Sequence, residues 1–176
     1  MILKLKRTPG IYLVGFMAAG KTTIGRALAE RLGWHFIDLD EEIEAAHKLS
    51  IAEIFETRGE EEFRRIEREA LRARVKAVES GRPTVMALGG GTFVAPANVD
   101  LLENNGITIW LDCPFAVVQR RVAQTGHRPL ARQPERFAQL YDERRQAYAR
   151  AAYSVRIESD DPDVAVDAVM RLPLFQ

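Results

Sequence analysis

The octapeptide Gly15-Phe16-Met17-Ala18-Ala19-Gly20-Lys21-Thr22 decides the fold of this chain. It matches the spacing GxxxxGK[ST] and stands where that spacing has a structural meaning. The apolar run 11–15 predicts a buried strand, and the apolar period of 21–32, closed by Gly33, predicts a helix. Such a loop turns its backbone N–H groups inward, so that they and the helix N-terminus hold phosphate oxygens. We therefore predict that this loop binds a nucleoside triphosphate.

Individual positions of this loop have distinct expected roles. Lys21 is expected to bridge the β- and γ-phosphates, and the Thr22 hydroxyl is expected to ligate Mg²⁺. The other expected nucleotide contacts are Ala18, Ala19, Gly20 and Thr23. The alternative is a glycine-rich turn that only lets a strand and a helix pack tightly. The complete motif between a strand and a helix favours the nucleotide site.

Strand-like and helix-like segments alternate along the rest of the chain. Further short apolar runs predict strands at 35–39, 84–88, 107–111 and 154–157. Helical patterns cover 51–55, the stretch from 60 to about 78, a stretch from about 115, and 162–171, and Gly59 predicts a break between the first two. This alternation is typical of βα units around a parallel sheet. We predict an α/β fold in which residues 1–176 form one domain.

Composition limits the partners of the protein. The 176 residues contain 25 Lys+Arg and 25 Asp+Glu, with 47% hydrophobic and 28% charged residues, which is typical of a globular protein rather than a disordered chain. A neutral charge balance argues against nucleic acid or an anionic membrane as the main partner. Phosphate chemistry must therefore come from a local site.

Cysteine content and hydropathy indicate the compartment. Cys113 is the only cysteine, so an intramolecular disulfide is excluded and a reducing compartment is indicated. No apolar run approaches the roughly 18 residues of a membrane span. The first residues show no cleavage pattern of an export signal. We expect a cytoplasmic protein.

Two carboxylates at 38 and 40 point to chemistry on a hydroxyl group. Asp38 and Asp40 end the predicted strand 35–39, and the carboxyl ends of strands are where open α/β sheets bind ligands. One carboxylate can hold the metal while the other orients and deprotonates an attacking hydroxyl. The alternative is an acidic start for a helix over 41–46.

Three further features are ambiguous when taken alone. Arg64 could offer a planar fork to a carboxylate, or pair with Glu60 four residues before it. Gly89-Gly90-Gly91 could let backbone approach a ligand closely, or form a plain flexible turn. Arg144 could complete the set of cations, although composition alone favours a solvated position in the charged cluster 143–145.

The segment 124–134 (QTGHRPLARQP) has neither a helical nor a strand period and predicts a mobile lid over the site. Arg128 within it could offset charge on the phosphoryl group during transfer. Asp112 also ends an apolar strand, as a metal-binding acid would, but Asp38 is the better candidate. The three histidines lack metal-ligand spacing.

Taken in order, these segments resemble the shikimate kinase family over nearly the whole chain. The matching pieces are GFMAAGKTTIGR at 15–26, FIDLD at 36–40, IAEIF at 51–55, GE at 59–60, FR at 63–64, LGGG at 88–91, RPL at 128–130, LY at 140–141, Arg144 and Tyr148. The resemblance implies ATP-dependent phosphorylation of the 3-hydroxyl of shikimate, in aromatic amino acid biosynthesis. It also implies a three-layer α/β/α P-loop kinase fold of the nucleoside-monophosphate-kinase type, with a five-stranded parallel sheet.

The resemblance also assigns parts and residues. It implies a P-loop at 15–22, a helical substrate-binding section at about 40–72 and a lid at about 124–134. By resemblance, Asp38 is the metal-associated acid and Asp40 the acid that binds substrate hydroxyls and can act as base. The shikimate site would comprise Asp40, Arg64, Gly89, Gly90, Gly91 and Arg144. The catalytic residues would be Lys21, Asp40 and the lid residue Arg128. The residues that frame the adenine would be Arg121 and Pro162.

The chain departs from the family pattern at two places. Ala18 stands where the family usually has glycine, and Asp160-Asp161 stands where some relatives carry basic residues near the nucleotide. The remaining alternatives are another small-metabolite kinase, such as a gluconate kinase, and a nucleotide-binding module without catalysis. The expected partners are shikimate and ATP with Mg²⁺, without nucleic acid or membrane, and the expected state is a monomer.

Overall fold

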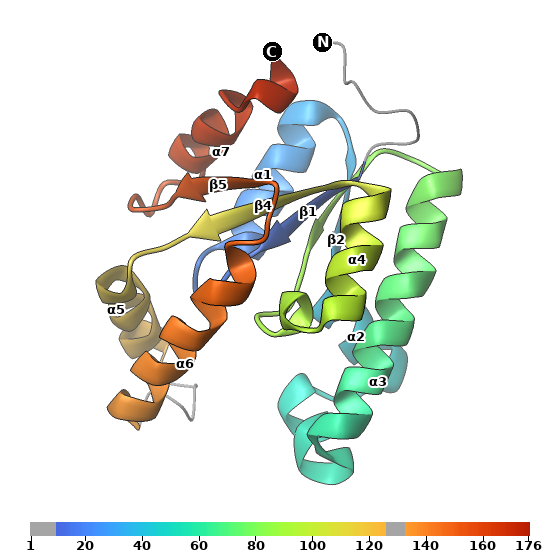
Figure 1. The fold of residues 1–176 in the computed structure, drawn as a ribbon, viewed down its shortest axis with the longest axis vertical. Coiled ribbons are helices and arrows are strands. Elements are labelled where there is room, and N and C mark those ends of the chain that lie inside the picture. The colour runs from blue at the N-terminus through green and yellow to red at the C-terminus, as the bar shows by residue number, and fades with distance from the viewer. Residues whose placement is uncertain (1–9, 126–132) are drawn as a thin grey trace.

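A parallel sheet of five strands forms the centre of the molecule (Figure 1). The computed structural model describes residues 10–125 and 133–176. The strand order is β2-β3-β1-β4-β5, and all neighbours are parallel. The strands are β1 Gly10–Val14, β2 His35–Asp38, β3 Thr84–Ala87, β4 Ile107–Asp112 and β5 Tyr153–Arg156. The predicted five-stranded α/β fold is confirmed.

Helices cover both faces of this sheet. They are α1 Lys21–Leu32, α2 Leu39–His47, α3 Ile51–Ser80, α4 Pro96–Asn105, α5 Phe115–Thr125, α6 Pro134–Tyr148 and α7 Pro162–Met170, with short 3₁₀ helices η1 Thr92–Val94 and η3 Pro173–Phe175. One layer contains α1 and α7, which pack on each other. The layer on the opposite face contains α3 and α4. The result is the predicted three-layer arrangement.

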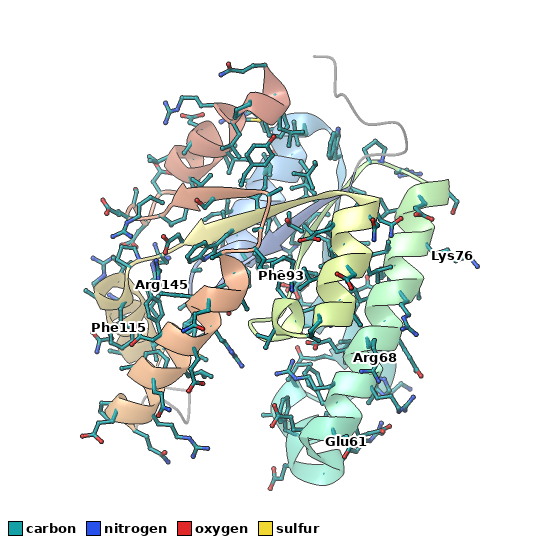
Figure 2. All side chains as sticks on the ribbon, viewed as in Figure 1. Glu61, Arg68, Lys76, Phe93, Phe115 and Arg145 are labelled. Carbon is teal, nitrogen blue, oxygen red and sulfur yellow. The ribbon has the colours of Figure 1, made fainter. Side chains whose placement is uncertain are left out.

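The burial of the strands explains why this sheet forms. Every residue of β1 and β3 is buried, as expected for parallel strands that helices cover on both faces. Side chains from both helical layers complete the core, among them Leu28, Leu71 and Phe93. Figure 2 shows Phe93 turned towards the interior and Lys76 pointing outward from α3.

The long helix α3 follows the local signals of its sequence. Ser50 caps its N-terminus with a complete capping box, in which the Ser50 hydroxyl accepts from the Glu53 amide and the Glu53 carboxylate accepts from the Ser50 amide. Gly59 interrupts it with φ 84° and ψ 167°, so two helical segments meet there at a kink. The predicted break at Gly59 is confirmed.

The prediction that Asp40 ends a strand is wrong. The strand β2 ends at Asp38, whose carboxylate caps α2 by accepting from the Glu41 amide at 3.0 Å. Asp40 therefore lies in the first turn of α2, which begins at Leu39. The alternative, an acidic helix start, describes the local structure better, because an Asp at the N-cap satisfies an otherwise unpaired backbone donor.

Two other sequence-based expectations concern the lid and the membrane. The predicted lid, 124–134, is too long at both ends, because Gln124 and Thr125 belong to α5 and Pro134 begins α6. Residues 126–132, with Arg128, lie outside the described residues. Within 10–125 and 133–176, no helix combines the length and apolar character needed to span a membrane.

We predict that Gly106→Ala destabilises the fold without touching the site. A Cβ on Gly106 would lie 2.5 Å from the Gly10 carbonyl oxygen and 2.5 Å from the Tyr12 ring, where the turn before β4 passes close to β1. Urea denaturation should show a loss of about 1–3 kcal/mol in the free energy of unfolding. Asn104→Ala, an exposed neighbour, should change it by less than about 0.5 kcal/mol, and equal losses would contradict the steric account.

Candidate active site

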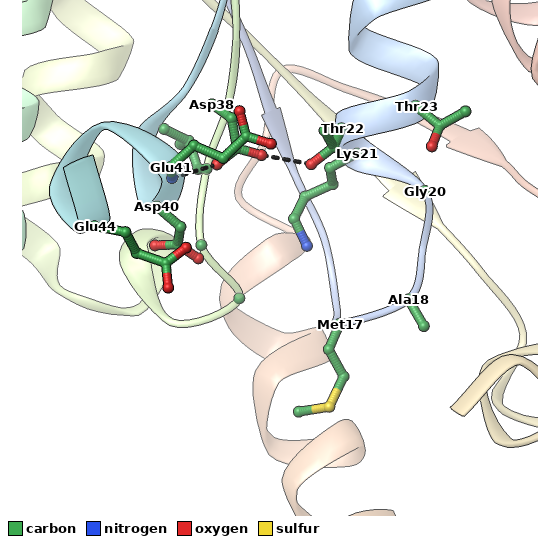
Figure 3. A pocket seen from close by; sticks show the side chains of 13 residues that line it. Met17, Ala18, Gly20, Lys21, Thr22, Thr23, Asp38, Asp40, Glu41 and Glu44 are labelled. Carbon is green, nitrogen blue, oxygen red and sulfur yellow. Dashed lines mark hydrogen bonds between the residues drawn. The ribbon is translucent and has the colours of Figure 1, made fainter. Parts of the chain in front are cut away.

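The carboxyl ends of the strands bring the predicted site residues to one edge of the sheet. The P-loop follows β1, Asp38 ends β2, and the glycines 89–91 follow β3. The chain runs from β1 to β2 on one side of β1, and from β3 it crosses to β4 on the other side of β1. The strand order therefore reverses at this edge. Such a switch point leaves a crevice that binds ligands. Here the crevice is a cavity of about 400 Å³, lined by residues of the P-loop, α2 and the glycine turn (Figure 3).

The P-loop has the geometry of an anion cradle. Gly20 caps α1 with φ 95°, a left-handed conformation that favours glycine. Ala18 also adopts a left-handed conformation, with φ 61°, where a residue with a Cβ is strained by about 1 kcal/mol. Lys21 Nζ donates to the carbonyl oxygens of Gly15 at 2.7 Å and Phe16 at 2.9 Å. The loop therefore keeps its expected bend despite Ala18, and the Lys21 side chain lies over the loop.

Thr22 and Asp38 lie side by side on the floor of the cavity. The Thr22 hydroxyl donates to Asp38 Oδ2 at 2.5 Å, while Asp38 Oδ1 accepts from the Glu41 amide (Figure 3). The two predicted metal ligands are therefore adjacent, although one lies on α1 and the other at the end of β2. Their oxygen atoms are ligands of the type that Mg²⁺ prefers.

Asp40 points into the cavity from α2. Its Oδ1 is buried and has no hydrogen-bond partner among residues 10–125 and 133–176. Burial, and then the negative charges of Glu67 and Asp38, raise the pKa of Asp40 from 3.8 to about 6, while Lys21 opposes this shift. Figure 3 shows the Lys21 ammonium and the Asp40 carboxylate facing each other across the pocket. A carboxylate with this pKa can accept a proton from a bound hydroxyl near neutral pH.

The glycine turn is the point on which the predicted acceptor-site side chains converge. A Cβ on Gly89 would lie 2.9 Å from Asp40 Oδ1. A Cβ on Gly90 would lie 3.0 Å from Arg144 Nη1, and a Cβ on Gly91 would lie 2.7 Å from Arg64 Nη1. Each glycine thus faces a different charged side chain. The absence of side chains lets a carboxylate and two guanidinium groups from three helices lie against one stretch of backbone.

A buried carboxylate that the sequence analysis did not single out holds Arg64. Arg64 Nη1 donates to Glu67 Oε1 at 2.9 Å, and the Thr92 hydroxyl donates to Glu67 Oε2 at 2.9 Å. Glu67 is 1% exposed, so its pairing with Arg64 is required to offset the loss of hydration. The suggested Arg64–Glu60 pair is also present, at 3.8 Å, but Glu60 is exposed. A carboxylate in the protein interior therefore holds the Arg64 guanidinium in place.

Arg144 is half-buried rather than solvated. Its guanidinium carbon lies 5.9 Å from the centroid of the Phe16 ring in the P-loop. One turn later on α6, the Tyr148 hydroxyl donates to the Gly90 carbonyl oxygen at 2.5 Å. Burial raises the pKa of Tyr148, so its hydroxyl stays protonated and remains a donor. α6 is thereby tied to the glycine turn, and Arg144 is held next to it.

Asp112, the rival metal acid, has a structural partner instead. Arg145 Nη1 lies 2.5 Å from its Oδ1, and Arg156 Nη1 lies 3.7 Å from its Oδ2. Arg145 also stacks over Trp110, with its guanidinium carbon 4.8 Å from a ring centroid. The preference for Asp38 agrees with this pairing. Among the described residues, no group of three or more Asp, Glu, His or Cys side chains could hold a metal ion.

A second cavity, of about 310 Å³, lies on the other side of the P-loop. Its lining includes the predicted adenine-frame residues Arg121, on α5, and Pro162, at the start of α7, together with Ala18, Gly20 and Thr23. Ala19 is buried beneath the loop, with no exposed surface. The lysine side of the P-loop thus faces the first cavity, and its other side faces the second.

The residues that sequence reasoning missed are supporting groups. Glu67 and Thr92 orient Arg64, and Glu44 lines the first cavity, where its carboxylate accepts from the Ile51 amide at 2.9 Å. Glu67 follows Arg64 by three residues, a spacing that allows a helical pair. Charged residues at that spacing are frequent on α3, so the spacing alone did not identify it. Its burial, which makes it distinctive, depends on η1.

The arrangement is suited to phosphoryl transfer onto a hydroxylated acid. The P-loop offers backbone donors and a cation for phosphates, Thr22 and Asp38 offer oxygen ligands, and Asp40 offers a proton acceptor. Arg64 and Arg144 offer two cations to a carboxylate. The P-loop residues, Asp38 and Asp40 line one cavity, and the two arginines lie against the glycine turn beside it.

Comparison with known proteins agrees with this geometry. The family model described as shikimate kinase matches residues 17–172. A shikimate kinase of Thermosynechococcus vestitus is 42% identical over 164 residues, which cover 91% of this chain and 87% of the relative. A shikimate kinase of Sulfurihydrogenibium sp. is 36% identical over 161 residues, which cover 91% of this chain and 95% of the relative. The solved structure of a shikimate kinase from Acinetobacter baumannii in complex with shikimate has a TM-score of 0.85 at 35% identity, covering 94% of this chain and 93% of that one.

We predict that Asp40→Asn stabilises the free protein near neutral pH. A carboxyl whose pKa is higher in the folded than in the unfolded state opposes folding once it ionises, so the penalty is absent below about pH 3.8 and complete above about pH 6. Asparagine cannot ionise, so the variant lacks this penalty. Chemical denaturation at pH 7.5 should show a gain of about 1–2 kcal/mol that disappears towards pH 4.

Glu44→Gln is the matched control, because it neutralises a carboxylate that lines the same cavity but is hydrogen-bonded. It should give a much smaller gain, because the Glu44 charge contributes least among the charges that raise the pKa of Asp40. A gain for Asp40→Asn that is the same at pH 4 and pH 7.5 would contradict the assigned charge penalty.

Proposed function

Since the chain belongs to the shikimate kinase family, whose members are ATP-dependent phosphotransferases, we propose that the two cavities hold the two substrates of shikimate phosphorylation. The family reaction moves the γ-phosphoryl group of ATP to the 3-hydroxyl of shikimate, giving shikimate 3-phosphate and ADP, in the route to chorismate and aromatic amino acids. The observation that carries the residue assignment is the convergence of Asp40, Arg64 and Arg144 on the glycine turn.

The proposed nucleotide site follows the P-loop. Backbone N–H groups of residues 18–23 hold the phosphates, and the Lys21 ammonium moves from the loop carbonyls to the β- and γ-phosphates when these are present. The base occupies the cavity between Arg121 and Pro162. Arg128, in the predicted lid, is proposed to offset charge on the group being transferred.

The residues present fit Mg²⁺. The Thr22 hydroxyl and the Asp38 carboxylate are adjacent oxygen donors, and Mg²⁺ is usually held by one or two protein oxygens together with substrate phosphates and water. Thr22 and Asp38 would hold the ion. When bound, the ion neutralises phosphate charge. Asp38 is positioned for this role by its hydrogen bond from the Glu41 amide.

The proposed acid site lies on the opposite side of Lys21. Arg64 and Arg144 bind the carboxylate of shikimate, which two guanidinium groups can hold with charged hydrogen bonds. The backbone of Gly89–Gly91 lies against the ring, because only glycine allows that approach. Asp40 accepts hydrogen bonds from the ring hydroxyls and takes the proton of the 3-hydroxyl as its oxygen attacks phosphorus.

The elevated pKa of Asp40 suits this role. At pH 7 a group of pKa about 6 is about nine-tenths ionised, so it is ready to accept a proton. A base of ordinary pKa, near 3.8, would bind the proton less tightly and assist the transfer less. The Oδ1 atom has no hydrogen-bond partner in the described part of the chain, so it retains its capacity to accept a hydrogen bond from that hydroxyl.

The remaining assignments are proposals about the whole chain. One domain would contain the P-loop at 15–22, the acid-binding section at about 40–72 and the lid at about 124–134. We propose a cytoplasmic monomer that binds ATP and shikimate and neither nucleic acid nor membrane. The neutral charge balance and single cysteine support this proposal.

The experiment that tests the function is a coupled assay of ADP release. With ATP and Mg²⁺, release should require shikimate and should not be stimulated by gluconate. Lys21→Ala should nearly abolish it, since the lysine contacts the group in transfer. Release with gluconate alone would support a different metabolite kinase, and absence of acceptor-dependent release would support a silent nucleotide-binding module.

We predict that Arg64→Ala and Arg144→Ala each raise the KM for shikimate about ten- to a hundredfold and leave the KM for ATP nearly unchanged. Each variant removes a charged hydrogen-bond partner of the carboxylate, worth about 1.5–3 kcal/mol. Gly91→Ala should act in the same direction, because its Cβ would displace the Arg64 guanidinium. Steady-state kinetics in both substrates provides the measurement.

Arg65→Ala is the control for the arginine variants. Arg65 neighbours Arg64 on α3, but its guanidinium is exposed and pairs with Glu62 and Glu69. Its removal should leave both KM values unchanged. Unchanged shikimate binding in Arg64→Ala and Arg144→Ala would exclude the proposed carboxylate site.

We predict a pH dependence that belongs to Asp40. Because the base must be ionised, kcat/KM of the free enzyme should fall about tenfold per pH unit below about pH 6. Asp40→Asn should lose this limb and at least about 10² in rate, whereas Asp38→Asn should raise the Mg²⁺ requirement. A limb that survives Asp40→Asn, in a variant with near wild-type rate, would exclude Asp40 as the base.

A further inference from the structure

The two departures of this chain from the family pattern meet at one guanidinium group. Arg121 Nη1 donates to the Ala18 carbonyl oxygen at 2.9 Å. On its other edge, Arg121 Nε and Nη2 donate to Asp160 Oδ1 at 3.1 and 2.9 Å, and Nη2 also donates to the Ser159 carbonyl oxygen at 3.1 Å. One side chain of α5 thus joins the P-loop to the turn before α7.

We propose that Asp160 is a positioning residue for nucleotide binding, whose carboxylate holds Arg121 between the base cavity and the carbonyl of Ala18. This proposal rests on the nucleotide site described above and adds a group that fixes its geometry. Asp160 does not need to touch the nucleotide in this role. It acts through the arginine.

The contacts of Arg121 explain why an anchor is effective. A free arginine side chain has many rotamers, so an unanchored guanidinium would occupy many positions. Here every guanidinium nitrogen donates to a protein acceptor, and the side chain is 19% exposed. Because its edges are bonded, its flat faces are the part left for stacking on a base.

The contact with Ala18 links the base cavity to the phosphate cradle. Ala18 and Lys48 are the two non-glycine residues with positive φ in the described part of the chain. Alanine disfavours this conformation, so the P-loop needs support that a glycine would not require. Arg121 provides a hydrogen bond to that residue's own carbonyl oxygen. Loss of the anchor should therefore weaken phosphate binding as well as stacking.

The charges around Asp160 explain why an acid is tolerated beside a polyphosphate. Arg120 Nη2 donates to both carboxylate oxygens, at 2.9 and 3.1 Å, in addition to the bonds from Arg121. These two arginines lower the pKa of Asp160, so it stays ionised. An isolated carboxylate there would repel the nucleotide, and its removal would tighten binding. The proposal predicts the opposite sign.

Calorimetric titration with ATP, without shikimate, tests the proposal on the intact protein at low salt. Asp160→Asn should weaken ATP binding about three- to fivefold, the scale of an exposed ion pair. The loss should be absent in an Arg121→Ala background and smaller in 0.5 M salt. In kinetics, the KM for ATP should rise while kcat and the KM for shikimate stay constant. Thermal melting checks that each variant is folded.

Glu158→Gln is the matched control, because it removes a nearby negative charge that pairs with Arg156 rather than Arg121. It should leave ATP affinity unchanged. Ala18→Gly should reduce the loss caused by Asp160→Asn, since glycine adopts the left-handed conformation without support. A loss unaffected by Ala18→Gly would overturn the link to the P-loop.

Two outcomes separate this proposal from the nucleotide site on which it rests. If Arg121→Ala weakens ATP binding but Asp160→Asn leaves it unchanged or tightens it, the positioning role of Asp160 is wrong and the base cavity stands. If neither variant changes ATP affinity, the base cavity is assigned wrongly.

Discussion

The close packing of charged side chains against the backbone of Gly89–Gly91 is the constraint on which the site depends. Asp40, Arg64 and Arg144 come from three different helices, α2, α3 and α6, and any side chain on the turn would occupy the space of one of them. The parallel sheet makes this possible, because it places the end of β3 between the ends of β1 and β2. The fold thus positions an acid-binding surface beside the phosphate cradle.

Supporting contacts keep these charges in place at some expense of stability. Glu67 is buried in order to hold Arg64, and Asp40 carries an ionised carboxylate in a site that disfavours charge. Both features are unfavourable for a packed interior unless they are paired or used. Glu67 is paired with Arg64 and Thr92, whereas Asp40 Oδ1 lacks a partner in the described part of the chain. This difference separates the positioning carboxylate from the proposed base.

Local sequence predicted the elements well where local physics decides them. The bounds of α1 were predicted correctly because the P-loop and Gly33 mark both ends, and the break at Gly59 because glycine adopts positive φ. Asp40 was placed on a strand because the capping role of Asp38 was not considered. The anchoring of Arg64 and Arg121 could not be predicted, because only the tertiary fold brings Thr92 to Glu67 and brings Asp160 and Ala18 to Arg121.

The most direct test of the central claim is a crystal structure of the protein with shikimate, ADP and Mg²⁺ bound. The account predicts the shikimate carboxylate within hydrogen-bond distance of both Arg64 and Arg144, the ring against Gly89–Gly91, and the 3-hydroxyl nearest to Asp40 and the phosphate end of the nucleotide. A carboxylate bound at Lys21, or a 3-hydroxyl directed away from Asp40, would contradict it.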